Sequence, residues 1–339
     1  MAQKPSRADV AHLAGVAEST VSRALNDSNL ITEPIKSRVR EAAKKLGYIP
    51  SRQAALFARN RTNTIGFVVP SYGSFPPFSR SYFPALLDGV VLETDANDYA
   101  TTVILDKQSS CNEDYMALIK SKTVDGLLFA VTRDDFGPFR GLRQQGVPFV
   151  LINNYQEGLN SVDALPEPGM RMAFSHGFNL GHKDFGYITG DMRYKNAIDR
   201  LNVFKKLCEE YGTASSVVEG DFSKTSGYRG AARLLSQANR PSIIMTSSDR
   251  SAFGVLNYAA EHGIRIPEEL SVIGYDNLPP VQDVSPPLST VDHPVTNLAK
   301  KATRLLLSIL KGERVEPIQE WLDTGFIVRE STSIFRPRP

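Results

Sequence analysis

From residue 64 onward, short apolar segments alternate with longer segments of helical periodicity. Eight of the apolar segments are four to six residues long, which suits buried strands. Strands that are apolar throughout and separated by helices are typical of parallel sheets that helices cover on both faces. The predicted strands are 65–70, 101–105, 126–131, 149–152, 185–189, 216–219, 243–246 and 272–275. With a further candidate at 321–328, their number favours an α/β body of two sheets over a single sheet.

Two stretches of this body interrupt the alternation. Residues 155–168 show no regular pattern, and residues 279–294 are rich in proline. We expect both to cross between the two sheets, with a long helix following at 295–310. The other predicted helices are 83–95, 113–120, 137–145, 169–179, 198–211, 226–238 and 251–261. Two parallel sheets joined by several crossings leave a cleft at the carboxyl ends of their strands, where such folds bind ligands.

The first 61 residues differ from the rest in charge. They hold 11 Lys and Arg against five Asp and Glu, a net charge of +6, whereas the remaining residues carry a net charge of −4. The net charge of the whole chain, +2, hides this asymmetry. A basic segment beside a mildly acidic body suggests a polyanionic partner for that segment. A solvated helical surface that happens to be basic is the alternative explanation.

The pattern of the basic segment predicts a helix, a tight turn and a second helix. Ser6 and Asp9 have the spacing of a capping box, and Gly15 ends the first helix because glycine tolerates the left-handed conformation. A second helix at 18–25 completes the layout of a helix-turn-helix, whose second helix enters the major groove of DNA. The outward residues of that helix, which are of types that contact phosphates or base edges, are Glu18, Ser19, Thr20, Ser22, Arg23 and Asn26.

Residues 9–26, DVAxLAGVAxSTVSRALN, resemble the DNA-binding motif of the lactose/galactose-repressor (LacI/GalR) family of bacterial transcription regulators. The match continues at Val39, Arg40, Ala42, Ala43, Leu46, Gly47, Tyr48 and Pro50. It covers essentially the whole chain, because family members carry a two-lobed body that is similar to periplasmic sugar-binding proteins.

The resemblance implies a division of the chain into three parts. These are a helix-turn-helix domain at 1–50, a hinge helix and linker at 51–61, and an effector-binding body at 62–339. Within the body, the first lobe is expected at about 62–163 and 294–320, and the second at about 164–293 and 321–339.

The hinge helix of family members orders when two copies enter the minor groove at the operator centre, where an apolar side chain wedges between base pairs. The register of this chain places Phe57 at the wedge position, where Leu is usual. Further DNA contacts are implied for Arg7, Arg52, Gln53 and Ala54. The implied assembly is a homodimer on a near-palindromic operator, with dimer contacts from the helices around 82–97 and 251–262.

The resemblance also implies a set of ligand contacts at the strand ends. Local motifs match Arg200 and Asp276 to polar ligand contacts and Phe222 to an aromatic that stacks on a sugar face. The implied set is Tyr82, Phe83, Asn153, Asn196, Arg200, Phe222, Ser248, Asp276 and His293. Core positions for the aromatic residues, a surface ion pair for Arg200 and a helix or turn cap for Asp276 are the alternatives.

Together these features predict a sequence-specific transcriptional regulator, a repressor whose operator affinity depends on a sugar or sugar derivative bound between the lobes. A nucleobase-type corepressor is one alternative, and a sugar-modifying enzyme with a DNA-binding head is another. The sequence contains no GxGxxG after a strand, no GxxxxGK[ST], no GxSxG and no HExxH. We therefore expect no enzyme, no cofactor and no metal.

The sequence also predicts where the protein acts. Its longest apolar runs, of about seven or eight residues, are short of the roughly 20 residues that a membrane span needs. No apolar signal segment follows Met1, and Cys111 and Cys208 lie too far apart in sequence for a CxxC pair. We expect no membrane partner and a location in the bacterial cytoplasm, on the nucleoid when the protein is bound to its operator.

Overall fold

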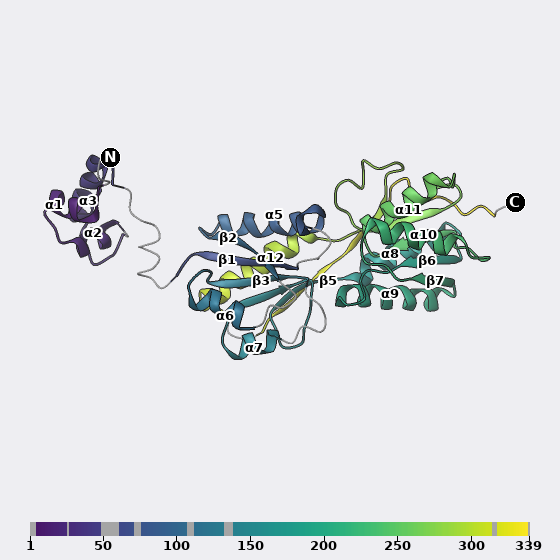
Figure 1. Cartoon of the computed structure of the whole chain (residues 1–339), viewed down its shortest axis with the longest axis horizontal. Coiled ribbons are helices and arrows are strands. Elements are labelled where there is room, and N and C mark those ends of the chain that lie inside the picture. The colour runs from purple at the N-terminus through teal and green to yellow at the C-terminus, as the bar shows by residue number, and fades with distance from the viewer. Residues whose placement is uncertain are drawn as a thin grey trace. The chain divides into compact units, whose positions relative to one another are not determined.

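The computed structural model describes residues 5–25, 27–48, 61–70, 76–106, 112–131, 138–313 and 317–337. The chain forms two compact units, Met1–Asn63 and Thr64–Pro339, whose elements Figure 1 labels. Among the described helices, none is both long enough and apolar enough to cross a membrane.

The first unit, the head, packs three helices around a small apolar core. These are α1 (Arg7–Ala14), α2 (Glu18–Leu25) and α3 (Glu33–Leu46). The predicted capping box is confirmed: the Ser6 hydroxyl accepts a hydrogen bond from the Asp9 amide, and the Asp9 carboxylate accepts one from the Ser6 amide. Gly15 ends α1 at a φ of 61°. The core residues that join the three helices are Val10, Ala11, Ala14, Val21, Ala24, Val39, Ala42 and Ala43.

The second unit contains two six-stranded sheets, and the first sheet has the strand order β11-β5-β4-β3-β1-β2. All neighbouring strands in it are parallel. Its strands are β1 (Thr64–Pro70), β2 (Ala100–Asp106), β3 (Gly126–Ala130), β4 (Phe149–Ile152), β5 (Ser161–Leu165) and β11 (Gln319–Asp323). One face packs against α5 (Tyr82–Asp95) and α12 (Val295–Leu310), and the other against α6 (Asn112–Lys120) and α7 (Pro138–Gln144).

The second sheet has the order β12-β10-β9-β8-β6-β7, in which only β12 runs antiparallel to its neighbour. Its strands are β6 (Asp184–Ile188), β7 (Ala214–Val218), β8 (Ile243–Thr246), β9 (Ser271–Asp276), β10 (Ser289–Asp292) and β12 (Gly325–Ile327). One face packs against α8 (Pro166–Asn179) and α9 (Lys195–Tyr211), and the other against α10 (Lys224–Leu235) and α11 (Asp249–Glu261). The predicted α/β body of two parallel sheets covered by helices is therefore confirmed.

The two sheets repeat one winding pattern. In each, the first strand of the lobe lies between the second and the third, so the winding of the chain reverses beside β1 and beside β6. At such a reversal the loops after neighbouring strands diverge and leave a crevice at their carboxyl ends. Both lobes therefore offer ligand-binding loops at this edge of their sheets.

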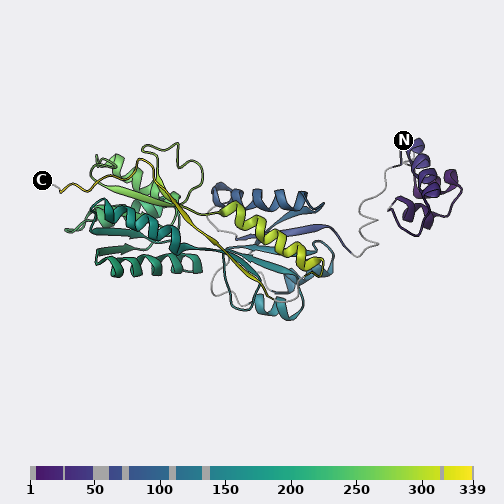
Figure 2. The ribbon, with the colours of Figure 1, turned by 180° about the vertical axis from the view of Figure 1, so that it is seen from behind.

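Each of the two stretches that we expected to cross between the sheets contains a strand, so the prediction that 155–168 lacks regular structure is wrong in part. Strand β5 falls within 155–168, and β10 falls within 279–294. The single predicted segment at 321–328 is two strands, because Thr324 breaks it. The Thr324 hydroxyl donates to the Leu165 carbonyl (2.8 Å) and accepts from the Gly169 amide (2.9 Å). Figure 2 shows the chain passing from one sheet to the other here.

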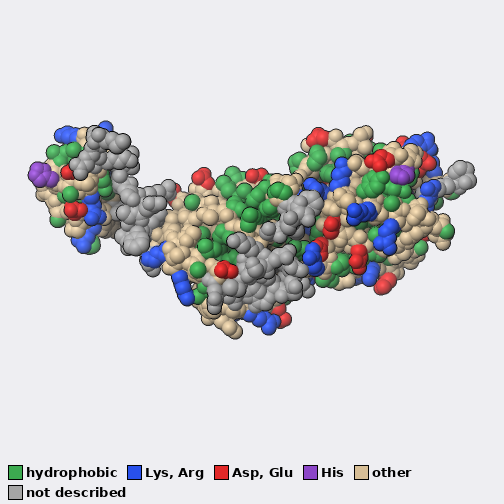
Figure 3. Space-filling view, in the orientation of Figure 1, with side chains coloured by type: hydrophobic (Ala, Val, Ile, Leu, Met, Phe, Trp, Pro, Cys, Tyr) green, Lys and Arg blue, Asp and Glu red, His purple; other side chains and the backbone are tan. Residues whose placement is uncertain are grey.

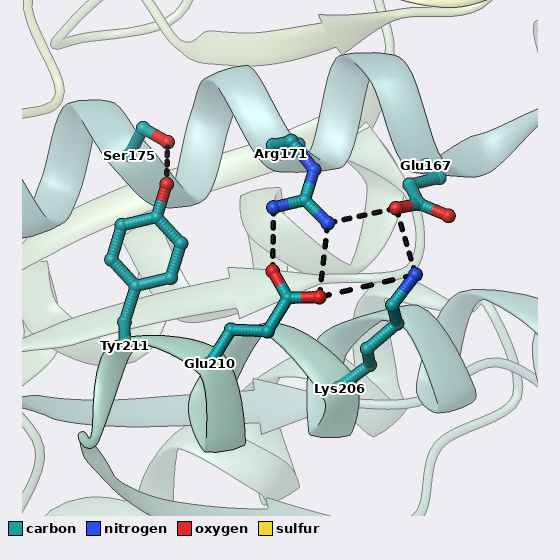
Figure 4. Close-up of polar contacts among 6 residues, drawn as sticks. All are labelled: Glu167, Arg171, Ser175, Lys206, Glu210 and Tyr211. Carbon is teal, nitrogen blue, oxygen red and sulfur yellow. Dashed lines mark hydrogen bonds and ion pairs between the residues drawn. The ribbon is translucent and has the colours of Figure 1, made fainter.

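An ion-pair network joins α8 to α9 on the surface of the second lobe (Figure 4). Arg171 donates to Glu210 at 2.6 Å and to Glu167 at 2.8 Å, and Lys206 reaches Glu167 at 3.0 Å. These side chains are 36–54% exposed, so solvent weakens each ion pair and the network contributes little to stability. We infer that its role is to align α8 with α9. Figure 3 shows charges of both signs interspersed over this lobe.

Candidate functional site

Helix α2 presents most of its predicted DNA contacts to solvent. Glu18, Ser19 and Arg23 are exposed, and Thr20 and Ser22 are half-buried. The remaining predicted contacts of the head and hinge, Asn26, Arg52, Gln53, Ala54 and Phe57, lie outside the described residues.

Two of the predicted contacts pair with each other. The Arg7 guanidinium lies 3.1 Å from the Glu18 carboxylate, and each side chain is about half exposed. A pair this exposed contributes little to stability and can open at little cost when DNA approaches. Arg7 is then available to a phosphate, and Glu18 to a base edge.

Part of the positive charge of the head is neutralised internally. Lys36 lies 3.0 Å from Asp27, and Arg40 lies 2.7 Å from Asp27 and 3.1 Å from Glu33. These two cations lower the pKa of the Asp27 carboxyl, Lys36 more strongly than Arg40. The pairs close the α2–α3 turn, so the count of 11 Lys and Arg overstates the number of cations that DNA meets.

Glu18→Ala is expected to change which operator sequence the head prefers more than it changes total affinity. A carboxylate repels phosphates but accepts a hydrogen bond from a cytosine amino group, and a good base contact is worth about 1–3 kcal/mol of discrimination. Site selection on random DNA measures this preference for both proteins. Identical consensus sequences would contradict the assignment of Glu18 to a base edge.

In the second unit, a cavity of about 80 Å³ opens among the strand-end loops of both sheets. This is several times the space that one water molecule needs. Seven of the nine predicted ligand contacts line the cavity. They are Tyr82, Phe83, Asn196, Arg200, Phe222, Ser248 and Asp276. We call this cavity the cleft.

Backbone strain gathers around the cleft. Val131, Asn153, Phe222, Asp276 and Asn277 follow or end strands, and all have φ between 46° and 127°. Non-glycine residues rarely adopt these conformations, and they cluster at ligand-binding and catalytic loops. Five strained residues at one edge of the two sheets single out that edge as a functional site.

Arg200 is only 4% exposed, on the inward face of α9, so the alternative of a surface ion pair is wrong. Its Nη1 donates to the Ser247 carbonyl at 2.6 Å, and its guanidinium carbon lies 3.6 Å from the centre of the Tyr275 ring. Burial alone would lower its pKa, but Tyr275 and Asp276 more than compensate, so the pKa is raised. A charged, oriented guanidinium therefore faces the cleft.

Two carboxyls, the buried Asp249 and the half-buried Asp276, line the cleft together with Arg200. Burial raises the pKa of Asp276 against the opposing charge of Arg200, and burial together with the charge of Asp276 raises the pKa of Asp249. Asp249 accepts hydrogen bonds from the Thr290 hydroxyl (2.5 Å) and the Leu278 amide (3.2 Å). Its carboxyl fits only because residue 274 is glycine, since a Cβ there would lie 2.2 Å from Oδ1.

The wall formed by α10 and α11 carries the aromatic Phe222. Its ring lies against Gly190, where a Cβ would come within 2.0 Å of it. Ser248 caps α11 by accepting from the Ser251 amide, and its hydroxyl donates to the Phe222 carbonyl at 3.2 Å. Ser248 thus has a structural role in addition to its place in the lining.

His293 and Asn153 lie behind the cleft lining. The His293 ring stacks on Tyr82 with centroids 5.9 Å apart, and its Nδ1 lies 3.6 Å from Asp276. Burial lowers its pKa well below the ordinary range. The Asn153 amide donates to the Tyr82 hydroxyl at 2.9 Å. Both residues therefore position Tyr82, and neither lines the cleft.

The structure adds lining residues that sequence reasoning did not select. They are Arg80, Ser81, Val131, Asp249, Arg250, Phe253, Leu278 and Pro279. A smaller pocket adjoins the cleft through Asn196 and Arg200 and contains Asn153 and Asp163. Asp163 is buried in the middle of β5, and burial raises its pKa to about 6.

Comparisons with known proteins agree with this architecture. The sequence pattern "Bacterial regulatory proteins, lacI family" matches residues 8–51, and "Periplasmic binding protein-like domain" matches residues 174–332. The chain is 30% identical to a ribose operon repressor of Halalkalibacterium halodurans over 328 residues, 96% of each chain. It is 31% identical over 320 residues to the HTH-type transcriptional repressor PurR of Edwardsiella ictaluri, 90% of each chain.

Among solved structures, a complex described as "transcriptional regulator CelR-cellobiose complex" superposes with a TM-score of 0.74 at 27% identity, covering 96% of this chain and 99% of that one. The identity to these repressors is 30% or more and extends over nearly the full length, so it assigns the head and the two-lobed body to the same family. The chain belongs to the LacI family of DNA-binding bacterial transcription regulators.

Proposed function

We propose that a saccharide or sugar derivative binds in the cleft and controls the affinity of the head for its operator. One observation carries this proposal: Arg200, Asp276 and Phe222 line the same cavity between the lobes. A guanidinium and a carboxyl exchange hydrogen bonds with hydroxyl groups, and an aromatic ring packs on the apolar face of a sugar. The names of two similar proteins, a ribose operon repressor and a cellobiose complex, are in keeping with this chemistry.

The two lobes contact each other across the cleft, so a ligand in the cleft can change their spacing. The Ser81 hydroxyl of the first lobe donates to the Pro279 carbonyl of the second lobe at 2.8 Å. A ligand that fits one spacing of the lobes better than another shifts the protein toward that spacing. By linkage, the same shift changes the operator affinity of the paired heads. The hinge that would transmit it, 51–61, lies largely outside the described residues.

The active species in this proposal is a homodimer on a near-palindromic operator. Apolar side chains remain exposed on α5 and the neighbouring edge strand β2, which supports a dimer contact there. They are Val91 (43% exposed), Leu92 (57%), Val103 (39%) and Leu105 (51%). We propose that the dimer works in the cytoplasm and acts by binding alone, without catalysis.

The test is a gel shift with an operator obtained by site selection, in the presence of neutral sugars and of nucleobases. One saccharide is expected to change operator affinity about 5- to 150-fold, the usual range of allosteric coupling. Asp276→Asn is expected to abolish that response and leave operator affinity without ligand unchanged. A response to nucleobases alone would favour a nucleobase corepressor, and chemical conversion of the sugar would favour the enzyme alternative.

A further inference from the structure

Two arginines that sequence reasoning did not select face the cleft from opposite lobes. Arg80 lies between the short 3-10 helix η1 (Pro77–Ser79) and α5 in the first lobe, and Arg250 lies in the first turn of α11 in the second. Both line the cleft, as does Arg200. Three guanidinium groups therefore surround one cavity of about 80 Å³.

The carboxyls of the cleft do not balance this charge. Asp249 is buried and Asp276 is half-buried, and the pKa values of both are raised, so their negative charge is reduced near neutral pH. Arg200 keeps its charge because its pKa is raised. The exposed carboxylate Asp221 accepts a hydrogen bond from the Ser223 amide at 2.9 Å, and its charge acts on both Arg80 and Arg250, so it offsets part of their charge. Among the residues that the structure describes, the lining of the cleft therefore has a net positive charge.

Arg80 and Arg250 repel each other across the cleft. Burial and, to a smaller extent, the charge of Arg80 lower the pKa of Arg250, whereas the charge of Asp221 raises it. Its Nη1 makes only a long contact to the Ser79 carbonyl, at 3.5 Å. Among the described residues, its buried Nε has no hydrogen-bond partner. Arg250 thus has donor capacity that the described residues do not use.

We propose that the effector carries an anionic group, a phosphate or a carboxylate, which binds between Arg80 and Arg250 and neutralises both. A planar guanidinium fork matches either anion with two parallel hydrogen bonds. The ring of the effector then packs beside Phe222 and Phe253, within reach of Arg200. This inference rests on the proposed function, because it assigns chemistry to the same effector.

An anion in this position also couples binding to the spacing of the lobes. Without it, like charges on the two lobes oppose their approach. With it, each arginine binds the same group, so the closed arrangement gains interactions that the open arrangement lacks. A neutral sugar provides no such difference at these two residues.

The test uses the full-length protein and matched ligand pairs. Calorimetry and thermal shift are measured with ribose and ribose 5-phosphate, glucose and glucose 6-phosphate, glucose and gluconate, galactose and galacturonate, and with inorganic phosphate alone. At least one anionic compound is expected to bind ten times more tightly than its neutral parent. Comparison of the sugar phosphates with the sugar acids then shows which anionic group the cleft binds.

Variants of the two arginines test whether they bind the anionic group. Arg80→Gln and Arg250→Gln are each expected to weaken binding of the anionic compound at least tenfold and to weaken binding of its neutral parent much less, so that the preference for the anion is lost. Arg250→Lys keeps the charge and is expected to retain part of the affinity, which separates loss of charge from misfolding. Arg233→Gln, on the exposed face of α10, removes the same charge away from the cleft and is expected to have no effect.

The inference is wrong if no anionic compound binds better than its neutral parent, or if Arg80→Gln and Arg250→Gln leave the preference unchanged. A neutral sugar that changes operator affinity more strongly than its anionic counterparts would overturn this inference and leave the proposed function standing. If no compound of either kind alters operator binding, both fail.

Discussion

Arg200→Met is expected to lower the free energy of unfolding of the body by about 3–5 kcal/mol, the usual cost of removing one partner of a buried charged pair. Arg200 is 4% exposed, and its guanidinium donates to the Ser247 carbonyl and covers the Tyr275 ring. Methionine fills much of the volume but leaves that carbonyl without its donor and Asp276 without its opposing charge. Urea unfolding followed by circular dichroism measures the change.

The loss of stability caused by Arg200→Met should grow as pH rises. The pKa of Asp276 in the folded protein is raised above its ordinary range, and without Arg200 it is raised further. A raised carboxyl pKa favours the folded state while the group is protonated, and this contribution disappears as pH increases through the folded pKa. The difference between wild type and Arg200→Met is therefore expected to be larger at pH 8 than at pH 6.

A second substitution separates charge from packing. Adding Asp276→Asn to Arg200→Met removes the isolated carboxyl and should recover part of the lost stability, so the two changes are expected to be non-additive. Arg233→Met serves as the control, because Arg233 is exposed on α10 and should cost little. Strict additivity, or a loss for Arg200→Met as small as for the control, would contradict the assignment of Arg200 to a buried charged cluster.

The parts of the fold that the sequence predicted are those with local signals. The capping box of Ser6 and Asp9, the glycine turn at Gly15 and the apolar strands of both sheets follow from neighbouring residues alone. Strand β5 has no such signal, because Asp163 and Ser161 interrupt its apolar pattern although both are buried. Their burial depends on pairing with β4 and β11, and β11 is more than 150 residues away in sequence.

The residues of the cleft also divide into those that local sequence motifs predict and those that they do not. Arg200, Phe222 and Asp276 follow recognisable strand-end motifs and do line the cleft. Arg80 and Arg250 carry no motif, and on a helix or its flank an arginine is most often a solvated surface residue. They matter because a separate lobe brings each to the same cavity, and sequence alone does not reveal that juxtaposition. His293 and Asn153 follow strands as predicted, but the side chain of Tyr82 lies in front of both.

Gly227→Ala is expected to lower the free energy of unfolding by about 1–3 kcal/mol, although alanine favours a helix by up to ~1 kcal/mol over glycine. Helices α10 and α11 touch backbone to backbone here. A Cβ on Gly227 would lie 2.0 Å from the Ser251 carbonyl oxygen, and one on Gly254 would lie 2.1 Å from the Lys224 carbonyl oxygen. Neither obstacle is a movable side-chain end, so the helices must separate.

That separation should reach the cleft, because both helices begin at its wall. Phe222 and Ser223 precede α10, Ser248 precedes α11, and the Ser248 hydroxyl joins the two by donating to the Phe222 carbonyl. Gly227→Ala is therefore expected to weaken effector binding as well as stability, and to leave the operator affinity of the unliganded protein unchanged. Arg233→Ala, an exposed change on the same helix, should alter neither property. If Gly227→Ala lowers stability and leaves effector affinity intact, the α10–α11 contact does not position the wall of the cleft.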